Sequence, residues 1–192
     1  MGFIGRMDID SLTRGMSKRE MGARDFIWLA CLGSAARGPA SLGDMAQAID
    51  VITAGQWLPV GELVSASVEE MARGNHLKAT HGGYTLTRRG RETLSLLMAQ
   101  PLARPASVFG QVGLRMKLAF LDLAEPGERH SHLQGMIEGY EEELARRQTP
   151  CQGTAGGSFG ELWRCHDIER LRRDLTLLRS MASGLGAPAT RH

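Results

Sequence analysis

Hydrophobic side chains recur at helical spacing along most of this chain, and strand-like alternation is confined to one short stretch. The apolar positions of residues 24–36 predict a helix that is apolar on most sides. Arg37-Gly38-Pro39 ends it, because glycine supplies a cap and proline cannot continue a helix. Ser41 lies three residues before Asp44, which predicts an N-cap for a second helix. The inward residues of that helix are Met45, Ala46 and Ile49.

A third helix and a hairpin follow. Residues 51–58 predict a loop, and Pro59 suits the first turn of a helix that runs to about Arg73. Short strands over 77–80 and 84–86 flank a glycine pair, and a fourth helix over 87–98 begins with Thr87 as its cap. This is the order of a winged helix-turn-helix, in which the third helix enters the major groove and the hairpin contacts the backbone. The predicted inward face of the third helix is Leu63, Val64, Val68 and Met71.

The second half predicts long helices. Pro101 and Pro105 mark a linker, since a helix through both would lose hydrogen bonds. Residues 112–123 are apolar on nearly every side, so we expect this helix to be buried, with a second copy as the partner that covers it. Pro126 starts a long helix, and Ser158 with Glu161 predicts a capping box for the last one. The apolar residues of these two helices lie three and four apart, as in a coiled coil: Leu133, Ile137, Tyr140 and Leu144, then Cys165, Ile168, Leu171, Leu175, Leu178 and Ala182.

The predicted fold class is therefore mostly α, with an N-terminal winged helix-turn-helix (three helices plus a β-hairpin wing) and a helical dimerisation domain. Residues 1–22 form an N-terminal extension and residues 23–100 the winged-helix DNA-binding domain. Residues 107–183 form the C-terminal domain, and residues 184–192 a flexible tail. We expect the run Glu141–Glu143 to be a solvated helix face rather than a pair of catalytic carboxylates.

Composition and charge exclude several classes of protein. The chain has 192 residues, of which 42% are hydrophobic, enough for one good core or two small ones. A net charge of +2 argues against a broadly basic coat, so any DNA-binding charge must be focused locally. The longest apolar run has seven residues, against about 20 for a membrane span, and charges interrupt any signal peptide. Three cysteines form no even framework, which fits a reduced compartment. We expect a cytoplasmic protein with no membrane partner.

The candidate DNA-binding residues come from helix starts, the third helix and the wing: Ser41, Gln56, Gly61, Ser65, Lys78, His81, Arg88 and Arg89. Those around the wing predict phosphate contacts, and the alternative is solvated charge at a strand end. Arg24 and Arg91 are further candidates for phosphate. The third helix carries Glu62 and Glu69 but few hydrogen-bond donors. Its exposed side is therefore interpreted equally well as an ordinary solvated helix face or as a surface that reads bases.

An enzyme is not indicated, and no cofactor is expected. The glycine-rich stretch over 153–157 follows a helix and lacks the lysine of a P-loop, and no serine lies in a Gly-x-Ser-x-Gly elbow. The spacing of His130, His132, Cys151, Cys165 and His166 does not match a metal site, so we interpret them as a packed thiol and surface histidines, with a thiol or metal sensor as the alternative. The aromatic residues that could line a ligand pocket or lie in a core are Trp57, Phe120 and Trp163.

Several segments together resemble the PadR-like transcriptional regulators, in particular the branch with a virulence-activator-type helical C-terminus. The matching residues are Leu114 to Leu123, Glu125 to Arg129, Ile168 to Leu175, Gly38-Pro39, Asp44 to Ala46 with Ile49, and Tyr84 to Gly90. The chain departs from the family at Leu42-Gly43, where a Gly-Tyr pair is usual, and at Ser65, where tyrosine is usual.

The resemblance implies a homodimeric regulator, usually a repressor, that binds a palindromic double-stranded DNA operator. It also implies a possible response to a small, often aromatic, effector at the dimer interface. The alternative is a dimeric winged-helix interaction scaffold that no longer reads DNA. The candidate dimerisation residues are Leu118, Phe120, Leu121, Ile137, Tyr140, Ile168, Leu171, Leu175 and Leu178.

Overall fold

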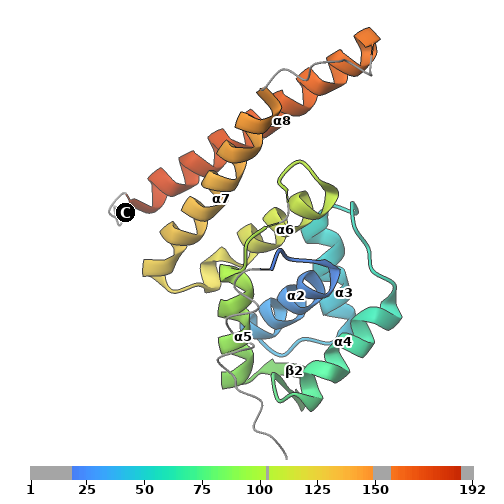
Figure 1. The fold of residues 1–192 in the computed structure, drawn as a ribbon. Helices are drawn as coiled ribbons and strands as arrows, with labels where there is room; N and C mark the ends of the chain where they lie inside the picture. Colours follow the sequence, from blue (N-terminus) through green and yellow to red (C-terminus); the bar gives the residue numbers. More distant parts are fainter. Residues whose placement is uncertain (1–18, 103, 149–156, 187–192) are drawn as a thin grey trace, which may run out of the picture.

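The computed structural model describes residues 19–102, 104–148 and 157–186 (Figure 1). This part of the chain is mostly helical with one two-stranded sheet, as predicted. Its elements are α2 (Ala23–Arg37), α3 (Leu42–Thr53), α4 (Gly61–Arg73), β1 (Leu77–Thr80), β2 (Gly83–Leu86), α5 (Arg88–Ala99), α6 (Val108–Ala119), the 3-10 turn η1 (Leu121–Leu123), α7 (Pro126–Gln148) and α8 (Gly157–Gly186). No helix of the described part is long and apolar enough to cross a membrane. Residues 1–18 of the predicted extension (1–22) and residues 187–192 of the predicted tail (184–192) lie outside the described residues.

Helices α2 to α5 and the hairpin form the winged helix, with α2 at its centre. The predicted capping box of α3 is present: Asp44 donates its backbone N–H to the Ser41 hydroxyl at 3.2 Å, and the Ser41 N–H donates to the Asp44 carboxylate at 2.8 Å. Two predictions nearby are wrong. Helix α3 runs three residues into the expected loop, because the buried Thr53 hydroxyl donates to the Ile49 carbonyl at 2.8 Å and closes its last turn. Helix α4 begins at Gly61, so Pro59 precedes it instead of lying in its first turn.

The inward face of α4 differs from the prediction at one position. Val64, Val68 and Met71 are buried, whereas Leu63 is 54% exposed. The buried residues follow one another four and three residues apart, and Leu63 lies about a quarter turn away from their mean direction. It is therefore an apolar side chain on the outer surface of the third helix.

The wing is docked against the chain that precedes α3. Strands β1 and β2 pair antiparallel with Leu77 opposite Leu86, and their turn is His81-Gly82. Tyr84 and Ala40 exchange two backbone hydrogen bonds of 2.8 and 3.0 Å, which form an isolated antiparallel bridge beside β2. Gly83 has a φ of +120°, and a Cβ there would lie 2.5 Å from the Ala40 carbonyl oxygen. The Gly82-Gly83 pair thus permits this close approach.

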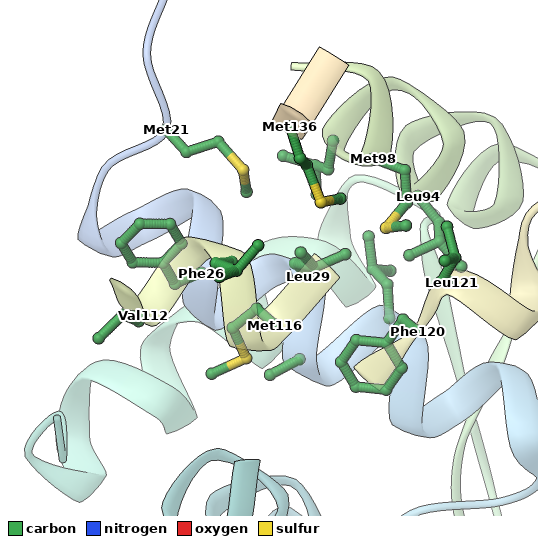
Figure 2. Packing of buried hydrophobic residues seen from close by; sticks show 14 of the residues in the cluster. Met21, Phe26, Leu29, Leu94, Met98, Val112, Met116, Phe120, Leu121 and Met136 are labelled. Carbon is green, nitrogen blue, oxygen red and sulfur yellow. The ribbon is translucent and has the colours of Figure 1, made fainter. Parts of the chain in front are cut away.

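Helix α6 closes the core of the winged helix. It begins at Val108, four residues before the prediction, with the Ser107 hydroxyl as its cap. It packs against α2 and α3 of the same chain, and Val112, Met116 and Phe120 are buried there (Figure 2). The Phe120 ring lies directly over Gly33 of α2. This apolar segment is therefore covered by α2 and α3 of the same chain. The prediction that a second copy of the chain covers it is wrong.

Helices α7 and α8 form a long antiparallel hairpin that projects from the winged helix (Figure 1). The apolar positions predicted three and four residues apart are buried along it, except that Cys165 is exposed. The predicted capping box of α8 is also wrong, since the helix already includes Ser158 and the Glu161 carboxylate accepts from Arg164 at 2.6 and 3.0 Å. Glu143 is buried, not solvated, and is paired with Arg146 at 2.6 Å and with Arg147 at 2.9 Å.

Candidate nucleic-acid interface

Helix α4, the wing and the start of α5 lie at the end of the winged helix that points away from the α7–α8 hairpin (Figure 1). Lys78 on β1, His81 in the wing turn, and Arg88 and Arg89 at the start of α5 are all exposed. The Arg88 side chain is 95% exposed, and its contact with Glu92, at 3.5 Å, is a loose surface pair. Four of the predicted DNA-binding residues are thus exposed on the hairpin and on the first turn of α5, and we call this part of the molecule the wing surface.

The N-cap of α5 holds the backbone of Arg88 and Arg89 in place. The Thr87 hydroxyl accepts the Gly90 N–H at 3.0 Å and donates to the Asn75 carbonyl at 2.7 Å. Gly90 lies against the His76 carbonyl so closely that a Cβ would overlap it. The first turn of α5 is therefore pinned to the chain between α4 and β1, and the arginines next to the cap share that fixed position.

His76 supports the same junction from inside. Its Nδ1 lies 3.0 Å from the Thr93 hydroxyl, and its ring meets the Trp28 ring edge-on at 5.2 Å. Burial lowers the pKa of His76, and the nearby Arg89 guanidinium lowers it further. A neutral imidazole at this place keeps positive charge on the surface rather than beneath it.

The outer face of α4 has a different character. Glu62, Ala66 and Glu69 lie opposite its buried residues and are exposed, while Ser65 is half-buried on the flank and Gly61 is exposed at the helix start. Exposed apolar side chains continue this face, namely Leu58, Val60 and Leu63. The third helix therefore presents acidic and apolar groups, which differ from the arginine, lysine, asparagine and glutamine usual for base readout.

Three further candidates are placed as follows. The Ser41 hydroxyl donates to the Asp44 carboxylate at 2.7 Å, and these hydrogen bonds lower the pKa of Asp44, so a negative charge occupies the N-terminus of α3. Arg24 forms an ion pair with Glu70 and stacks over the Trp28 ring at 5.1 Å, so it is not a free phosphate ligand. Gln56 is exposed in the loop between α3 and α4.

The candidate dimerisation residues lie inside one chain. Phe120 and Leu121 belong to the core around α6, and Leu118 packs against it. Ile137 and Tyr140 are buried on α7, and the Tyr140 hydroxyl donates to Asp174 of α8 at 3.4 Å. The remaining four, Ile168, Leu171, Leu175 and Leu178, are buried along α8. The apolar spacing in the sequence therefore marked residues that pack between α7 and α8 of one chain. An interface between two copies would have to lie on other surfaces.

One exposed apolar surface was missed in the sequence. Phe159, Leu162 and Trp163, in the first two turns of α8, are strongly exposed, and the Trp163 ring lies 5.2 Å from the His166 ring. We call these three residues the hairpin tip. The available signal was that they fall outside the spacing of the buried seam, so that α8 has a second apolar face. Trp57 and Phe120, the other two aromatic pocket candidates, are packed on Phe26 and Gly33.

A cavity of about 790 Å³ lies where the end of α5 and the following linker face α7. Lys117 of α6 and Gln100 at the end of α5 are buried in its wall, together with the partly exposed His132 of α7. The Lys117 ammonium donates to the Met98 carbonyl at 2.7 Å and to the Gln100 carbonyl. Burial lowers the pKa of Lys117 to about 8. This cationic joint between the winged helix and the hairpin was not identified from the sequence, because nothing in the spacing of α6 distinguishes the buried Lys117 from its neighbouring cation Arg115.

Among the residues that the structure describes, no group of three or more histidine, cysteine, aspartate or glutamate side chains could hold a metal ion. Cys31 is buried, and burial raises the pKa of its thiol to about 12, while Cys165 lies on the surface. Cys151 lies outside the described residues. The interpretation of Cys165 as a sensor thiol is therefore supported only by its exposure.

Comparisons with known proteins identify a regulator family. A family model described as "Putative AphA-like transcriptional regulator" matches residues 17–182. Among solved structures, the crystal structure of Bacillus subtilis PadR is 15% identical, with a TM-score of 0.40, and the match covers 88% of this chain and 100% of that one. Its complex with p-coumaric acid is 15% identical (TM-score 0.39; 88% and 99% covered), and its complex with operator DNA is 18% identical (TM-score 0.36; 82% and 98% covered). No curated protein sequence matches the chain.

Proposed function

The chain belongs to the family of AphA-like transcriptional regulators, and from this premise we propose that it binds a palindromic DNA operator as a homodimer and represses transcription in the cytoplasm. As a transcriptional regulator it is not an enzyme. The observation that carries the proposal is the wing surface: Lys78, His81, Arg88 and Arg89 are exposed on the hairpin and at the start of α5, and the hairpin packs against the third helix through β1. Positive charge gathered on one surface attracts phosphate even when the net charge of the chain is small.

In this proposal the wing surface supplies affinity and orientation. The arginines at the start of α5 contact phosphates on either side of the groove that α4 enters. Because the Thr87 cap and Gly90 pin this helix start, the charges are presented without reorganisation of the backbone. Gln56, Gly61 and Ser65 then lie nearest to the bases and contribute to sequence preference.

In this proposal the dimer interface lies on the α7–α8 hairpin. The seam between α7 and α8 is already filled within one chain, so we place the second copy against the hairpin tip of Phe159, Leu162 and Trp163. Large exposed apolar groups of this kind mark interaction surfaces. A dimer of this type fixes the distance between the two wing surfaces, and a palindromic operator matches that twofold symmetry.

The test is a titration of the protein's own upstream DNA by fluorescence anisotropy at several salt concentrations. For a specific regulator, binding falls steeply with salt and exceeds binding to scrambled DNA by about a thousandfold. The double variant Arg88→Ala with Arg89→Ala removes four charges from a dimer, so the slope of log affinity against log salt falls by about four.

A matched control is available on α8. Arg172→Ala with Arg173→Ala removes two exposed arginines, one of which has a loose pair with Glu169 at 3.7 Å, much as Arg88 has with Glu92. This control leaves the salt slope unchanged. If both double variants lower the slope equally, the wing surface does not make the phosphate contacts. If wild-type protein does not bind its upstream DNA even at low salt, the DNA-binding proposal fails.

One observation favours a second candidate function, that of a dimeric interaction scaffold. The outer face of α4 carries Glu62, Glu69 and the exposed Leu63, which suit a basic and apolar protein partner better than a phosphate backbone. A scaffold remains dimeric yet binds neither upstream nor scrambled DNA at low salt. Dimerisation measured by sedimentation together with that absence of DNA binding would favour this second function.

We also propose that a small ligand adjusts the regulator. The support is the cavity at the joint between α5 and α7, because a molecule bound there contacts both the winged helix and the hairpin that sets the dimer. A ligand that prefers one arrangement changes operator affinity by its differential binding, typically about 1–3 kcal/mol. The measurement is operator affinity with and without the compound. An affinity that stays constant at saturating ligand would contradict this role.

A further inference from the structure

The outer face of α4 combines carboxylates with small and apolar side chains. Its exposed residues follow one another four, three and four positions apart and form one stripe along the helix: Glu62, Ala66, Glu69 and Arg73. Leu63 is 54% exposed and lies beside this stripe, one turn before Ala66. Helix α4 lies at the edge of the winged helix (Figure 1), so the chemistry of this face decides what the helix can bind.

The acceptors on this face are not used inside the chain. Glu70, beside the stripe, forms an ion pair with Arg24, whose guanidinium stacks over the Trp28 ring at 5.1 Å. Within the described residues, Glu62 and Glu69 form no ion pair and are exposed. An exposed carboxylate in this state accepts hydrogen bonds from an external donor.

The apolar residues at the start of α4 are held outward by the loop before the helix. Leu58 and Val60 are 66% and 64% exposed. The Thr53 hydroxyl donates to the Trp57 carbonyl at 3.0 Å, and the Trp57 ring meets an aromatic ring of α2 edge-on at 5.7 Å. The Leu63 N–H donates to the Val60 carbonyl at 2.9 Å. The exposed apolar surface at the helix start is thus a fixed part of the fold, and its burial by a partner is favourable.

These groups match the edges of pyrimidines in the major groove of DNA. A carboxylate accepts from the N4 amino group of cytosine, and apolar side chains contact the C5 methyl group of thymine. Both purines present N7 there as an acceptor, with which a carboxylate does not pair. Purine readout usually needs arginine, lysine, asparagine or glutamine, and α4 contains none of these before Arg73.

We propose that α4 reads pyrimidines: Leu63 and Ala66 contact thymine methyl groups, and Glu62 accepts a hydrogen bond from the N4 amino group of a cytosine. This inference rests on the proposed function, because it needs α4 in the major groove of the operator. Glu62 and Leu63 lie in the first turn of the helix, where base edges are nearest, and Arg73 at its other end contacts the phosphate backbone. The carboxylate also repels phosphate, so DNA without a suitably placed cytosine is bound more weakly.

The first experiment removes thymine methyl groups without changing base pairing. The protein's upstream DNA is prepared with deoxyuridine in place of every thymidine, and its affinity for the full chain is measured by fluorescence anisotropy at one low salt concentration. A buried methyl group contributes about fourfold to affinity, and a homodimer buries the same methyl in both half-sites. Uracil DNA therefore binds at least about tenfold more weakly than thymine DNA.

Two leucine variants locate this effect. Leu63→Ala loses its methyl contact, so the difference between thymine and uracil DNA shrinks by at least about threefold. Leu177→Ala is the control, because it removes a leucine of α8 that is 56% exposed, and it keeps the full difference. A change in the stiffness of uracil DNA would weaken the wild type and both variants equally, and that result overturns the methyl readout.

N4-methylcytosine tests the carboxylate, because its methyl group replaces the amino hydrogen that faces the major groove while the pairing hydrogen stays. Upstream DNA with this base binds the wild type at least about tenfold more weakly, and Glu62→Ala loses this sensitivity. Glu62→Ala also binds scrambled DNA at least about twofold more tightly at low salt, since it no longer repels phosphate. Glu142→Ala removes an exposed carboxylate of α7 instead, and it behaves like the wild type in both measurements.

The outcomes separate this inference from the proposed function. Specific binding to upstream DNA that is indifferent to uracil and to N4-methylcytosine overturns the pyrimidine readout and leaves the regulator standing. A uracil effect without an N4-methylcytosine effect refutes the role of Glu62. A dimer that binds none of these DNAs at low salt overturns both proposals and assigns the outer face of α4 to a protein partner.

Discussion

The buried lysine at the joint predicts an unusual dependence of stability on pH. Lys117 is 4% exposed, and burial lowers its pKa from 10.5 to about 8 in the folded chain. A folded state with the lower pKa releases the proton first, so between pH 8 and 10.5 the unfolded chain holds more protons. The free energy of unfolding therefore rises with pH in this window, by about 3 kcal/mol in total at about 1.4 kcal/mol per pKa unit. About 2 kcal/mol of this gain falls between pH 7.5 and 9.5.

Lys117→Met isolates this contribution. Urea unfolding followed by circular dichroism, at pH 7.5, 8.5 and 9.5, gives the free energy for wild type and variant, and the difference between them grows with pH by about 2 kcal/mol. Other groups with raised pKa values, such as Cys31, cancel in this difference. Lys78→Met is the control, because Lys78 is exposed on the wing. If the difference between wild type and Lys117→Met stays flat over this range, the lysine is not buried as a cation and the reasoning is refuted.

Three further predictions concern stability and can be checked by thermal or urea unfolding. Gly33→Leu forces a side chain into the Phe120 ring, which lies over this glycine, and lowers stability by at least about 1–3 kcal/mol; an unchanged midpoint would contradict the packing. Ser41→Ala removes the cap of α3 and costs about 1 kcal/mol, while operator affinity stays constant because the hydroxyl is occupied by Asp44. Leu178→Ala in the hairpin seam costs about 2–5 kcal/mol, whereas the exposed neighbour Leu177→Ala stays within about 0.5 kcal/mol.

The family and the order of elements were predictable from the sequence because each depended on local signals. The PadR-like resemblance is confirmed at the level of the family, and the winged helix with its hairpin lies where the turn residues and apolar spacing placed it. Ser41 and Thr87 were recognised as caps because a hydroxyl followed three residues later by a free N–H is a short-range arrangement. The exposure of Lys78 and Arg88 was predictable because a charged side chain in a short strand or at a helix start usually lies in solvent.

What could not be predicted depended on which distant segment covers a given face. The seam of α7 and α8 has the same spacing whether its partner is the next helix or a second chain, so Ile137 and Leu171 were assigned to a dimer. Glu143 was expected in solvent because the sequence shows Arg146 and Arg147 in the next turn but not that Asp167 of α8 lies beside Arg147. The carbonyls of Met98 and Gln100, which accept from Lys117, likewise lie at the end of α5, 19 and 17 residues earlier in the chain.

The position of α6 decides where this chain can be divided. The helix follows the proline-containing linker, yet Val112, Met116 and Phe120 complete the core under α2, and Gly113 lies against Phe26. A fragment that stops at the linker therefore loses one wall of its core and exposes the face of α2 that the helix covers. We therefore expect the smallest autonomous piece to end after η1, and a recombinant exchange of hairpins between related regulators to join best at Pro126, where α7 begins.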